Sequence, residues 1–464
     1  MPRSLYKKLY SGMNYSFLLE SGPGPEKTSR FSFTGGRPFK VIKSRKDEIE
    51  IIERDGTVTR RQGNPILELE KTIDFKAWSG PGLLPHFWGG CVGFLGYDAA
   101  HFIEDLPDTT ADDIELPDMV FFFPMEMVVM DHISGITRAV VLVEGEGMDP
   151  SSNSYQFGLE RLGEFVGRIQ DACGANISNK SAKSKWTAKR LGCNQTRWEF
   201  EESVRKVKDY IREGDVYQAN ISRRMEMEFD GDPFGLYERL FEINPSPFSA
   251  FMRLDGFSLV CCSPERLVKV DGQNISTRPI AGTRPRGSDA VKDLRLSEEL
   301  ILNEKERAEH LMLVDLERND LGRVCRPGTV EVDELMVLES YSHVWHIVSN
   351  IKGMLREGVG LAGILSACFP GGTITGCPKV RCMEIIDEIE PTRRGPYTGS
   401  LGYIGFDGRM DLNIIIRTIV VKGDRAYIQT GAGIVADSVP EMEFQETEKK
   451  AEAMLEALSQ QIRE

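Results

Sequence analysis

The chain has 464 residues, of which 41% are hydrophobic, and 57 Lys and Arg against 71 Asp and Glu give a formal net charge of −14. This length exceeds one typical core and predicts two domains or one large double-layered unit. The acidic balance predicts no nucleic-acid partner, because phosphate binding needs a positive surface. Any site for an anionic ligand must therefore be a local basic pocket.

The nine cysteines are odd in number and form no Cys-x-x-Cys ladder. This pattern predicts reduced thiols rather than a disulfide framework or a zinc site. The N-terminal residues hold no apolar run of signal-peptide length. No stretch reaches the ~18 apolar residues that a membrane span requires. We therefore expect a cytoplasmic protein with no membrane partner.

The N-terminal part, residues 1–173, is predicted to form a domain of strands and turns with a helix or two. Residues 49–60 predict a hairpin on an Asp-Gly turn, and residues 119–132 predict buried strand. The polar, Ser- and Lys-rich residues 174–190 predict an exposed linker. Residues 191–464 follow as a second predicted domain, in which long helices alternate with paired strands.

Within the first domain, Gly89-Gly-Cys91-Val-Gly93 has the Gly-x-Cys-x-Gly form of the nucleophile turn of a glutamine amidotransferase. No His-x-Glu follows anywhere downstream to activate the thiol. Cys91 also lies in an apolar run, where the pKa of a thiol rises. We therefore expect a structural cysteine, and a chain that does not release ammonia from glutamine itself.

Two helices of the second domain carry carboxylates on one face. The first is predicted over 297–321 with Ser297 as its N-cap, and the second begins with the capping-box pattern Ser438-Val-Pro-Glu441. The first face holds Leu302, Glu306, Glu309, Leu313 and Leu316, and the second holds Glu443, Glu446 and Lys450. Such faces could hold a hard dication through oxygen ligands. The alternative is solvated helix surface with ordinary Glu–Lys pairs.

A hairpin is predicted from residues 412–421 and 425–430. Alternation would put Arg417 on the same strand face as Ile415 and Ile419. An arginine among isoleucines needs an anionic partner, since an unpaired buried charge is costly. That partner is a carboxylate of the protein or of a ligand.

The glycine-rich segment 369–379 leads into a predicted helix over 380–389. Gly371 and Gly376 have the spacing of a phosphate loop, but Cys377-Pro378 follow where that loop has Lys and Ser or Thr. Two interpretations remain. The segment is either a turn whose backbone N–H groups donate to a bound carboxylate or a tight connection without a ligand. The basic segment 277–287 is a weaker signal, a rigid loop able to border an anion site.

Several of these segments occur together in one order. They are Ser263-Pro-Glu-Arg266, Pro279-Ile-Ala-Gly-Thr283, Asn303 to His310, Asp315 to Asp320, Gly371 to Lys379, Gly431-Ala-Gly433 and Glu441 to Lys450. From about residue 195 to 460 the chain resembles the chorismate-binding synthases, which include anthranilate, aminodeoxychorismate, isochorismate and salicylate synthases. Phe17 to Ser21 and Gly89 to Tyr97 resemble the two amine-forming branches. The resemblance implies an α+β fold like that of anthranilate synthase component I, a large α/β sandwich of antiparallel sheets flanked by helices.

The resemblance also implies roles for single residues. Glu265 would be the general acid that protonates the departing hydroxyl, beside Gln218, and His346 and Thr373 would line the substrate ring. Mg²⁺ would be held by Glu309 and Glu446, with Glu306 and Glu443 in or near its shell. Substrate-binding positions would be Ala281, Gly282, Thr283, Tyr397, Arg417, Gly431, Ala432, Gly433 and Lys450. Glu20, Ser21, Pro247 and Phe248 would border a candidate tryptophan pocket.

These roles fit the chemistry of chorismate, which carries two carboxylates. An acidic protein must concentrate positive charge locally to bind it, here through Arg417, Lys450 and the metal. Glu265 can serve as an acid only where apolar surroundings keep it protonated.

Gln218 points to ammonia as the nucleophile. Isochorismate and salicylate synthases carry a lysine at the matching position to activate water, whereas ammonia has its own lone pair and needs no base. The implied partners are chorismate, ammonia and a glutamine amidotransferase subunit that supplies the ammonia. A non-catalytic docking subunit is the alternative, and it predicts a missing acid or metal ligand, yet Glu265, Glu309 and Glu446 are all present.

The product is expected to be aminodeoxychorismate, with anthranilate as the alternative. Asn220 and the segment 244–251 resemble the aminodeoxychorismate branch. Ala281 stands where many of its members have a lysine that attacks the ring, so a covalent intermediate is not expected at this position.

Overall fold

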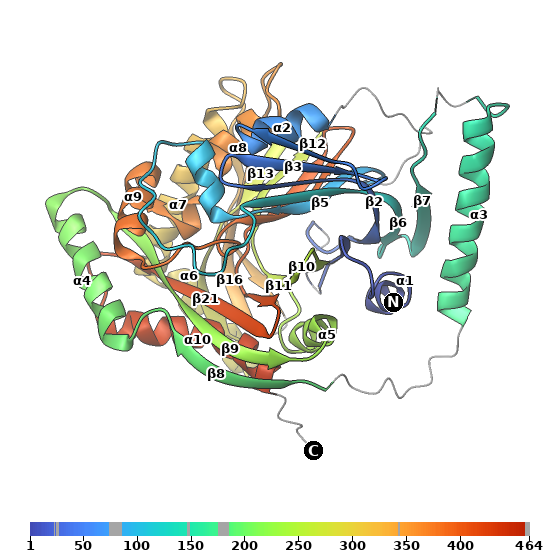
Figure 1. The fold of residues 1–464 in the computed structure, drawn as a ribbon. Helices are drawn as coiled ribbons and strands as arrows, with labels where there is room; N and C mark the ends of the chain where they lie inside the picture. Colours follow the sequence, from blue (N-terminus) through green and yellow to red (C-terminus); the bar gives the residue numbers. More distant parts are fainter. Residues whose placement is uncertain are drawn as a thin grey trace.

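The computed structural model describes residues 1–22, 24, 27–73, 86–145, 149–174, 185–341 and 344–459. Within these residues, 21 strands join in one hydrogen-bonded sheet whose ladders between named strands are all antiparallel. Helices lie around the strands, with α4 and α9 on one side of the molecule and α3 on the opposite side (Figure 1). This arrangement confirms the predicted α+β class. No described helix is long and apolar enough to cross a membrane.

The helices are α1 Pro2–Leu9, α2 Pro65–Thr72, α3 Asn153–Gly174, α4 Arg197–Glu213, α5 Pro233–Ile243, α6 Ala290–Leu302, α7 Glu304–Gly322, α8 Leu361–Cys368, α9 Lys379–Ile389 and α10 Pro440–Ser459, with short 3-10 turns η1 Tyr97–Phe102 and η2 Gly372–Ile374. The strands of the N-terminal part are β1 Ser16–Glu20, β2 Phe31–Arg45, β3 Glu48–Glu53, β4 Val58–Gln62, β5 Gly90–Leu95, β6 Met119–Asp131 and β7 Ile136–Val141. Those of the C-terminal part are β8 Thr187–Cys193, β9 Gln218–Asp230, β10 Phe248–Arg253, β11 Phe257–Ser263, β12 Arg266–Asp271, β13 Asn274–Arg278, β14 Ile280–Pro285, β15 Glu331–Ser340, β16 Val344–Met354, β17 Gly376–Cys377, β18 Ser400–Gly405, β19 Met410–Asn413, β20 Thr418–Lys422 and β21 Arg425–Ile434.

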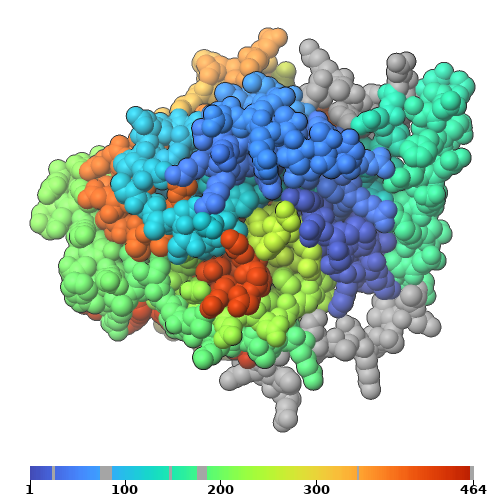
Figure 2. Space-filling model, in the orientation of Figure 1, coloured from blue at the N-terminus to red at the C-terminus, as the bar shows by residue number. Residues whose placement is uncertain are grey.

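The two parts of the chain share this sheet. β1 pairs with β10 and β5 pairs with β18, so strands from both predicted domains lie side by side. Figure 2 shows the same mixing on one face, where blue N-terminal segments lie against yellow-green and orange-red C-terminal ones. The domain boundary at 174–190 stays a prediction. Of that segment, residues 175–184 lie outside the described residues and 187–190 belong to β8.

Apolar side chains fill both faces of the central strands. β6 is buried along nearly its whole length, as its continuous apolar sequence predicts. Phe122 packs among Phe17 and Phe94 in one cluster, while Phe200 of α4 packs with Ile221 of β9 in another. β3 and β4 confirm the hairpin predicted over 49–60. This double-sided core holds β9 and β21 rigidly, and those strands carry much of the site described below.

The single helix predicted over 297–321 is two helices in the structure, because α6 ends at Leu302 and α7 begins at Glu304. Asn303 takes an extended conformation that ends α6, and its side-chain Oδ1 accepts the Glu306 amide and starts α7. Ser297 lies inside α6 rather than at its start. An asparagine that can cap a new helix therefore overrode the continuous periodic pattern.

Two further boundaries differ from prediction. α10 begins at Pro440 rather than with a capping box, because the Ser438 hydroxyl accepts the Val435 amide instead. The strand predicted over 412–421 is interrupted between β19 and β20. Arg417 has φ +53°, a left-handed conformation that strand alternation cannot describe. Its predicted placement on one strand face with Ile415 and Ile419 is therefore wrong.

Candidate active site

Glu265 lies in the turn between β11 and β12, and its backbone carbonyl accepts the Ile414 amide. The side chain is only 5% exposed. Burial raises the pKa of Glu265 to about 7, opposed by the Thr373 hydroxyl, the Ile280 backbone amide and the Lys450 ammonium. A carboxyl with this pKa holds a proton in part of the population near neutral pH, as a general acid must.

Thr373 faces this carboxyl from the turn η2. Its Oγ1 and the Oε1 atom of Glu265 are both buried without a hydrogen-bond partner. Buried polar atoms are nearly always paired, so these two neighbouring atoms are available to bind each other or a polar group of a ligand. The segment predicted over 369–379 thus forms a turn that leads into α9, and this much of the prediction is confirmed.

The start of β9 presents two amide side chains. Gln218 and Asn220 alternate with Ala219 and so point to one face of the strand. The Oε1 atom of Gln218 and the Oδ1 atom of Asn220 are also buried without a partner. Both amides have room because β21 offers glycines opposite them. A Cβ at Gly433 would lie 2.3 Å from Gln218 Nε2, and one at Gly431 would lie 2.5 Å from Asn220 Oδ1.

The acidic faces of α7 and α10 approach one another beside these amides. Gln218 Nε2 donates to Glu309 Oε1 over 3.2 Å. Burial raises the pKa of Glu309, and the Glu306 and Glu446 carboxylates raise it further. Burial likewise raises the pKa of Glu443, together with Glu446. The four predicted metal ligands are therefore close enough for their charges to repel.

This donor set suits a hard dication, because carboxylates that repel one another gain most from a cation among them. Among the described residues, no three His, Cys, Asp or Glu side chains form a group that could hold a metal ion as they stand. Mg²⁺ does not require one, since it binds through one or two carboxylates and completes its shell with water and substrate oxygens. The residues present fit such an ion, and magnesium stays a prediction.

Two cations, Arg417 and Lys450, lie beside the carboxylates of α10. Arg417 Nη1 donates to the Lys450 carbonyl over 2.7 Å, and Lys450 Nζ donates to the Gly431 carbonyl over 2.9 Å and pairs with Glu446 over 2.7 Å. Burial lowers the pKa of Arg417, which the nearby Tyr397 and Glu446 oppose. No described carboxylate forms an ion pair with Arg417. A half-buried guanidinium in this position can bind an anionic ligand.

β14 and β16 border the site with His346. Its Nδ1 lies 3.0 Å from Thr283 Oγ1 and 3.2 Å from the Gly282 carbonyl. Burial lowers the pKa of His346 to about 4, so the ring is neutral near pH 7. A Cβ at Gly282 would lie 2.9 Å from Glu306 Oε2, which places this strand beside the carboxylates. Ala281 is buried in β14.

The side chain of Ala432 points away from the site, and the predicted role of its backbone stays a prediction. Ala432 alternates with Gly431 and Gly433 on β21 and packs into the hydrophobic core.

Cys91 is buried in β5, where burial raises the pKa of its thiol well above the usual value. It therefore has the properties expected of a structural cysteine.

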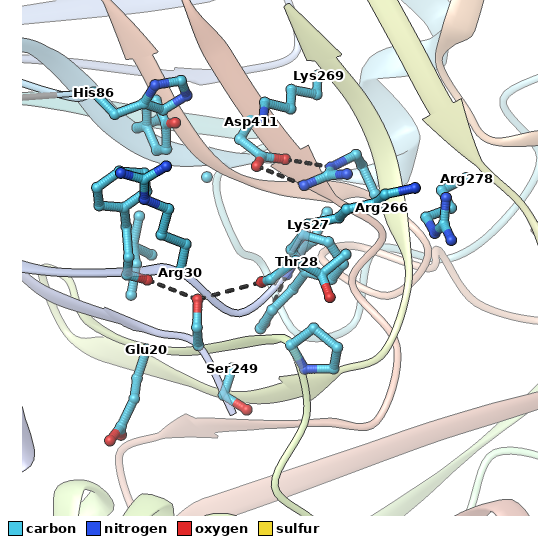
Figure 3. Close-up of a pocket in the computed structure, with 18 of the residues that line it drawn as sticks. Glu20, Lys27, Thr28, Arg30, His86, Ser249, Arg266, Lys269, Arg278 and Asp411 are labelled. Carbon is cyan, nitrogen blue, oxygen red and sulfur yellow. Dashed lines mark hydrogen bonds and ion pairs between the residues drawn. The ribbon is translucent and has the colours of Figure 1, made fainter. Parts of the chain in front are cut away.

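The four residues of the candidate tryptophan pocket lie apart from Glu265. Glu20, Ser21, Pro247 and Phe248 all line one cavity of about 1020 Å³. Its wall carries the bidentate pair of Arg266 with Asp411, joined over 2.8 and 2.9 Å (Figure 3). The Glu20 carboxylate accepts the Tyr237 hydroxyl and pairs with Arg3. The prediction is right that these residues share a cavity, and the ligand stays a prediction.

Arg394 is a residue beneath the site that sequence reasoning missed. It is 3% exposed, pairs with Glu390 over 2.7 Å and lies under the ring of Tyr397. Helix spacing gives no signal for this pair, because α9 ends at Ile389 and the polar segment Glu390-Pro-Thr-Arg-Arg394 follows it.

Comparison with known proteins agrees with this geometry. Residues 16–456 match the model of the family described as chorismate binding enzyme. The chain is 42% identical over 463 residues to anthranilate synthase component 1 of Acetivibrio thermocellus, covering 99% of this chain and 93% of the relative. It is also 42% identical over 466 residues to aminodeoxychorismate synthase component 1 of Bacillus subtilis, covering 98% and 93%.

Among solved structures, anthranilate synthase component I from Streptococcus pneumoniae superposes with a TM-score of 0.79 at 34% identity and 92% coverage of both chains. The menaquinone-specific isochorismate synthase of Escherichia coli shares the fold. It has a TM-score of 0.67 at 16% identity, covering 98% of this chain and 100% of that one. The chain therefore belongs to the chorismate binding enzyme family, as a chorismate-utilising enzyme of the anthranilate and aminodeoxychorismate synthase type.

Proposed function

We propose that this protein is component I of an aminodeoxychorismate synthase, which replaces the ring hydroxyl of chorismate with an amino group from ammonia. The observation that carries the proposal is Glu265, a buried carboxyl with a pKa of about 7 and an unpartnered oxygen. It lies within reach of the charge of Lys450 and opposite Thr373. This arrangement supports protonation of a leaving hydroxyl on a bound anion.

Substrate binding would rest on Arg417, Lys450 and Tyr397. Chorismate is a dianion, and Arg417 is a half-buried cation that forms no ion pair with a carboxylate among the described residues. A ligand carboxylate supplies that partner and offsets the cost of burying the guanidinium. The remaining ring contacts fall to Thr373 and the neutral His346.

The chemical step would begin with proton transfer from Glu265 to the ring hydroxyl, which then leaves as water. A correctly placed acid contributes roughly 10²–10⁴-fold to such a step. Ammonia supplies the electron pair for the new carbon–nitrogen bond, and the proton that its nitrogen then loses would restore the acid form of Glu265. The unpartnered amide oxygens of Gln218 and Asn220 can accept its N–H groups and hold it.

Glu309 and Glu446, with Glu306 and Glu443 beside them, would hold Mg²⁺. Bound there, Mg²⁺ would neutralise a substrate carboxylate and draw electron density from the ring. Gln218 keeps the Glu309 carboxylate oriented by its hydrogen bond. The source of ammonia would be a glutamine amidotransferase, since the relatives are named as component 1 and Cys91 is buried in β5.

Anthranilate formation is the second candidate. The observation that favours it is the large cavity lined by Glu20, Ser21, Pro247 and Phe248, since a tryptophan pocket is expected in an enzyme that begins tryptophan synthesis. Against it stands Asn220, whose unpartnered oxygen lies beside Gly431 in the site and which resembles the aminodeoxychorismate branch.

One assay separates the two products. Purified protein is given chorismate, Mg²⁺ and an ammonium salt, with and without added aminodeoxychorismate lyase. We expect p-aminobenzoate only when the lyase is present. Anthranilate fluorescence without the lyase would establish the second candidate instead.

A further inference from the structure

Beneath the site, the Arg394 guanidinium ties together three segments that carry site residues. It follows α9 and is 3% exposed. Nη1 donates to the Ile374 carbonyl over 3.0 Å, and Nη2 donates to the Asn220 carbonyl over 2.6 Å. The same group donates to Glu390 and to the Thr398 hydroxyl over 3.3 Å. All of these bonds come from one planar side chain.

The Asn220 carbonyl needs this donor because of how β9 meets β17. Their antiparallel ladder reaches Asn220, whose amide donates to the Thr375 carbonyl over 2.9 Å. In a regular ladder Thr375 would return its own amide to Asn220. Here that amide turns back to the Gly372 carbonyl within η2. Arg394 supplies the missing donor and adds a second bond to Ile374, next to Thr373.

Glu390 balances the charge of Arg394 while the guanidinium keeps its hydrogen bonds to the backbone carbonyls. Glu390 is buried beside it and also accepts the amide and hydroxyl of Ser222 on β9. The guanidinium lies between two rings, 4.7 Å from the centroid of Tyr97 and 5.7 Å from that of Tyr397. The pair is therefore neutral overall, hydrogen-bonded on both sides and stacked under Tyr397.

We infer that Arg394 is a positioning residue of the catalytic centre. It fixes the turn that carries Thr373 against the strand that carries Gln218 and Asn220, and it supports Tyr397 from below. The inference rests on the proposed function, because those residues are taken to hold the acid, the nucleophile and the substrate. It adds to that function that one buried guanidinium sets the spacing between these residues.

The test is Arg394→Lys, assayed with chorismate and ammonium at saturating and limiting concentrations. Lysine keeps the charge beside Glu390 but cannot bridge two carbonyls in one plane. A misplacement on the order of 1 Å costs about 10²-fold in turnover. We therefore expect kcat to fall on the order of 10²-fold, while the KM for chorismate changes much less because Arg417 and Lys450 remain in place and only Tyr397 loses support.

Arg224→Lys is the matched control. Arg224 is also buried on β9 and donates to a backbone carbonyl, that of Arg393, and to Asp113, but it contacts no site residue. We expect Arg224→Lys to retain the wild-type kcat. The melting temperature of each variant is measured alongside, so that the kcat values refer to folded protein.

Arg394→Lys with wild-type kcat would overturn the inference, and so would a loss of kcat that Arg224→Lys shows equally. If Arg394→Lys is insoluble, the double variant Glu390→Gln/Arg394→Gln decides, since it removes both buried charges together. We expect that variant to fold and to lose turnover in the same way. Failure of both to fold would reduce Arg394 to a structural role. Wild-type protein that leaves chorismate unchanged would instead refute the proposed function.

Discussion

The Gln218 amide and the Glu309 carboxylate, joined over 3.2 Å, connect the nucleophile side of the site to its acidic helix face. A neutral amide can donate to the carboxylate through its nitrogen while its oxygen remains free to accept from ammonia. A protonated lysine at this position would have no acceptor to offer. The contact therefore links the choice of nucleophile to the orientation of a predicted metal ligand.

Glu309→Gln is expected to abolish turnover while the protein stays folded. Its carboxylate is buried and repelled by Glu306 and Glu446, so removing the charge relieves repulsion but removes a metal ligand. Activity against Mg²⁺ concentration, with the melting temperature, provides the measurement. Glu304→Gln, at the exposed start of the same helix, should remain active. Full activity of Glu309→Gln would remove the metal assignment.

Glu265→Gln is expected to lower kcat by roughly 10²–10⁴-fold, since the amide cannot give up a proton. In the wild type the acid must be protonated, so activity should fall as the pH rises through about 7. The burial-raised pKa has a second consequence for stability. The folded state favours the protonated form, so wild-type stability is lost as the pH rises from 4.5 through about 7.

The melting temperature of Glu265→Gln relative to wild type should therefore increase between acidic and mildly alkaline pH. A difference that does not vary with pH would contradict the assignment of the raised pKa to Glu265.

Arg417→Gln is expected to weaken substrate binding and to stabilise the free protein. The half-buried guanidinium has no carboxylate ion pair among the described residues, so its removal relieves a desolvation cost on the order of 1 kcal/mol. Loss of a buried charge partner raises the KM for chorismate by about 30-fold or more. Arg60→Gln, which breaks an exposed pair with Glu50, should change neither quantity. A destabilised Arg417→Gln with unchanged KM would contradict this role.

Gly433→Ala is expected to displace Gln218, because the new Cβ would lie 2.3 Å from its Nε2. The side chain can rotate away, so the fold should persist while turnover falls by about tenfold or more. Gly192→Ala on β8, where a Cβ meets nothing within 4 Å, is the control. Steady-state rates at equal folded concentration compare the two. Equal activity of both variants would show that Gln218 needs no fixed position.

The comparison of sequence and structure shows which features local patterns can predict. The 49–60 hairpin and the β6 strand follow from residues close in the chain and were predicted correctly. The interruption at Arg417 and the helix break at Asn303 were not predicted. At both positions the side chain bonds to backbone, that of Lys450 for Arg417 and that of Glu306 for Asn303, and the regular pattern ends. Arg394 was missed for a related reason. Its partners Asn220 and Ile374 are brought together only by the completed sheet.

The site residues themselves came from motif resemblance rather than from periodicity. Spacing on one helix face could suggest that Glu306 and Glu309 lie together, but not that Gln218 contacts Glu309 from β9. The burial that raises the pKa of Glu265 likewise depends on packing across the whole sheet.

The most direct test of the account is chorismate consumption by the wild-type protein with Mg²⁺, in the presence and in the absence of ammonium. We expect consumption only when ammonium is present, and consumption by Glu265→Gln that is slower by roughly 10²–10⁴-fold. Consumption at the same rate without ammonium would mean that water is the nucleophile, and it would contradict the account of Gln218 and of the amination itself.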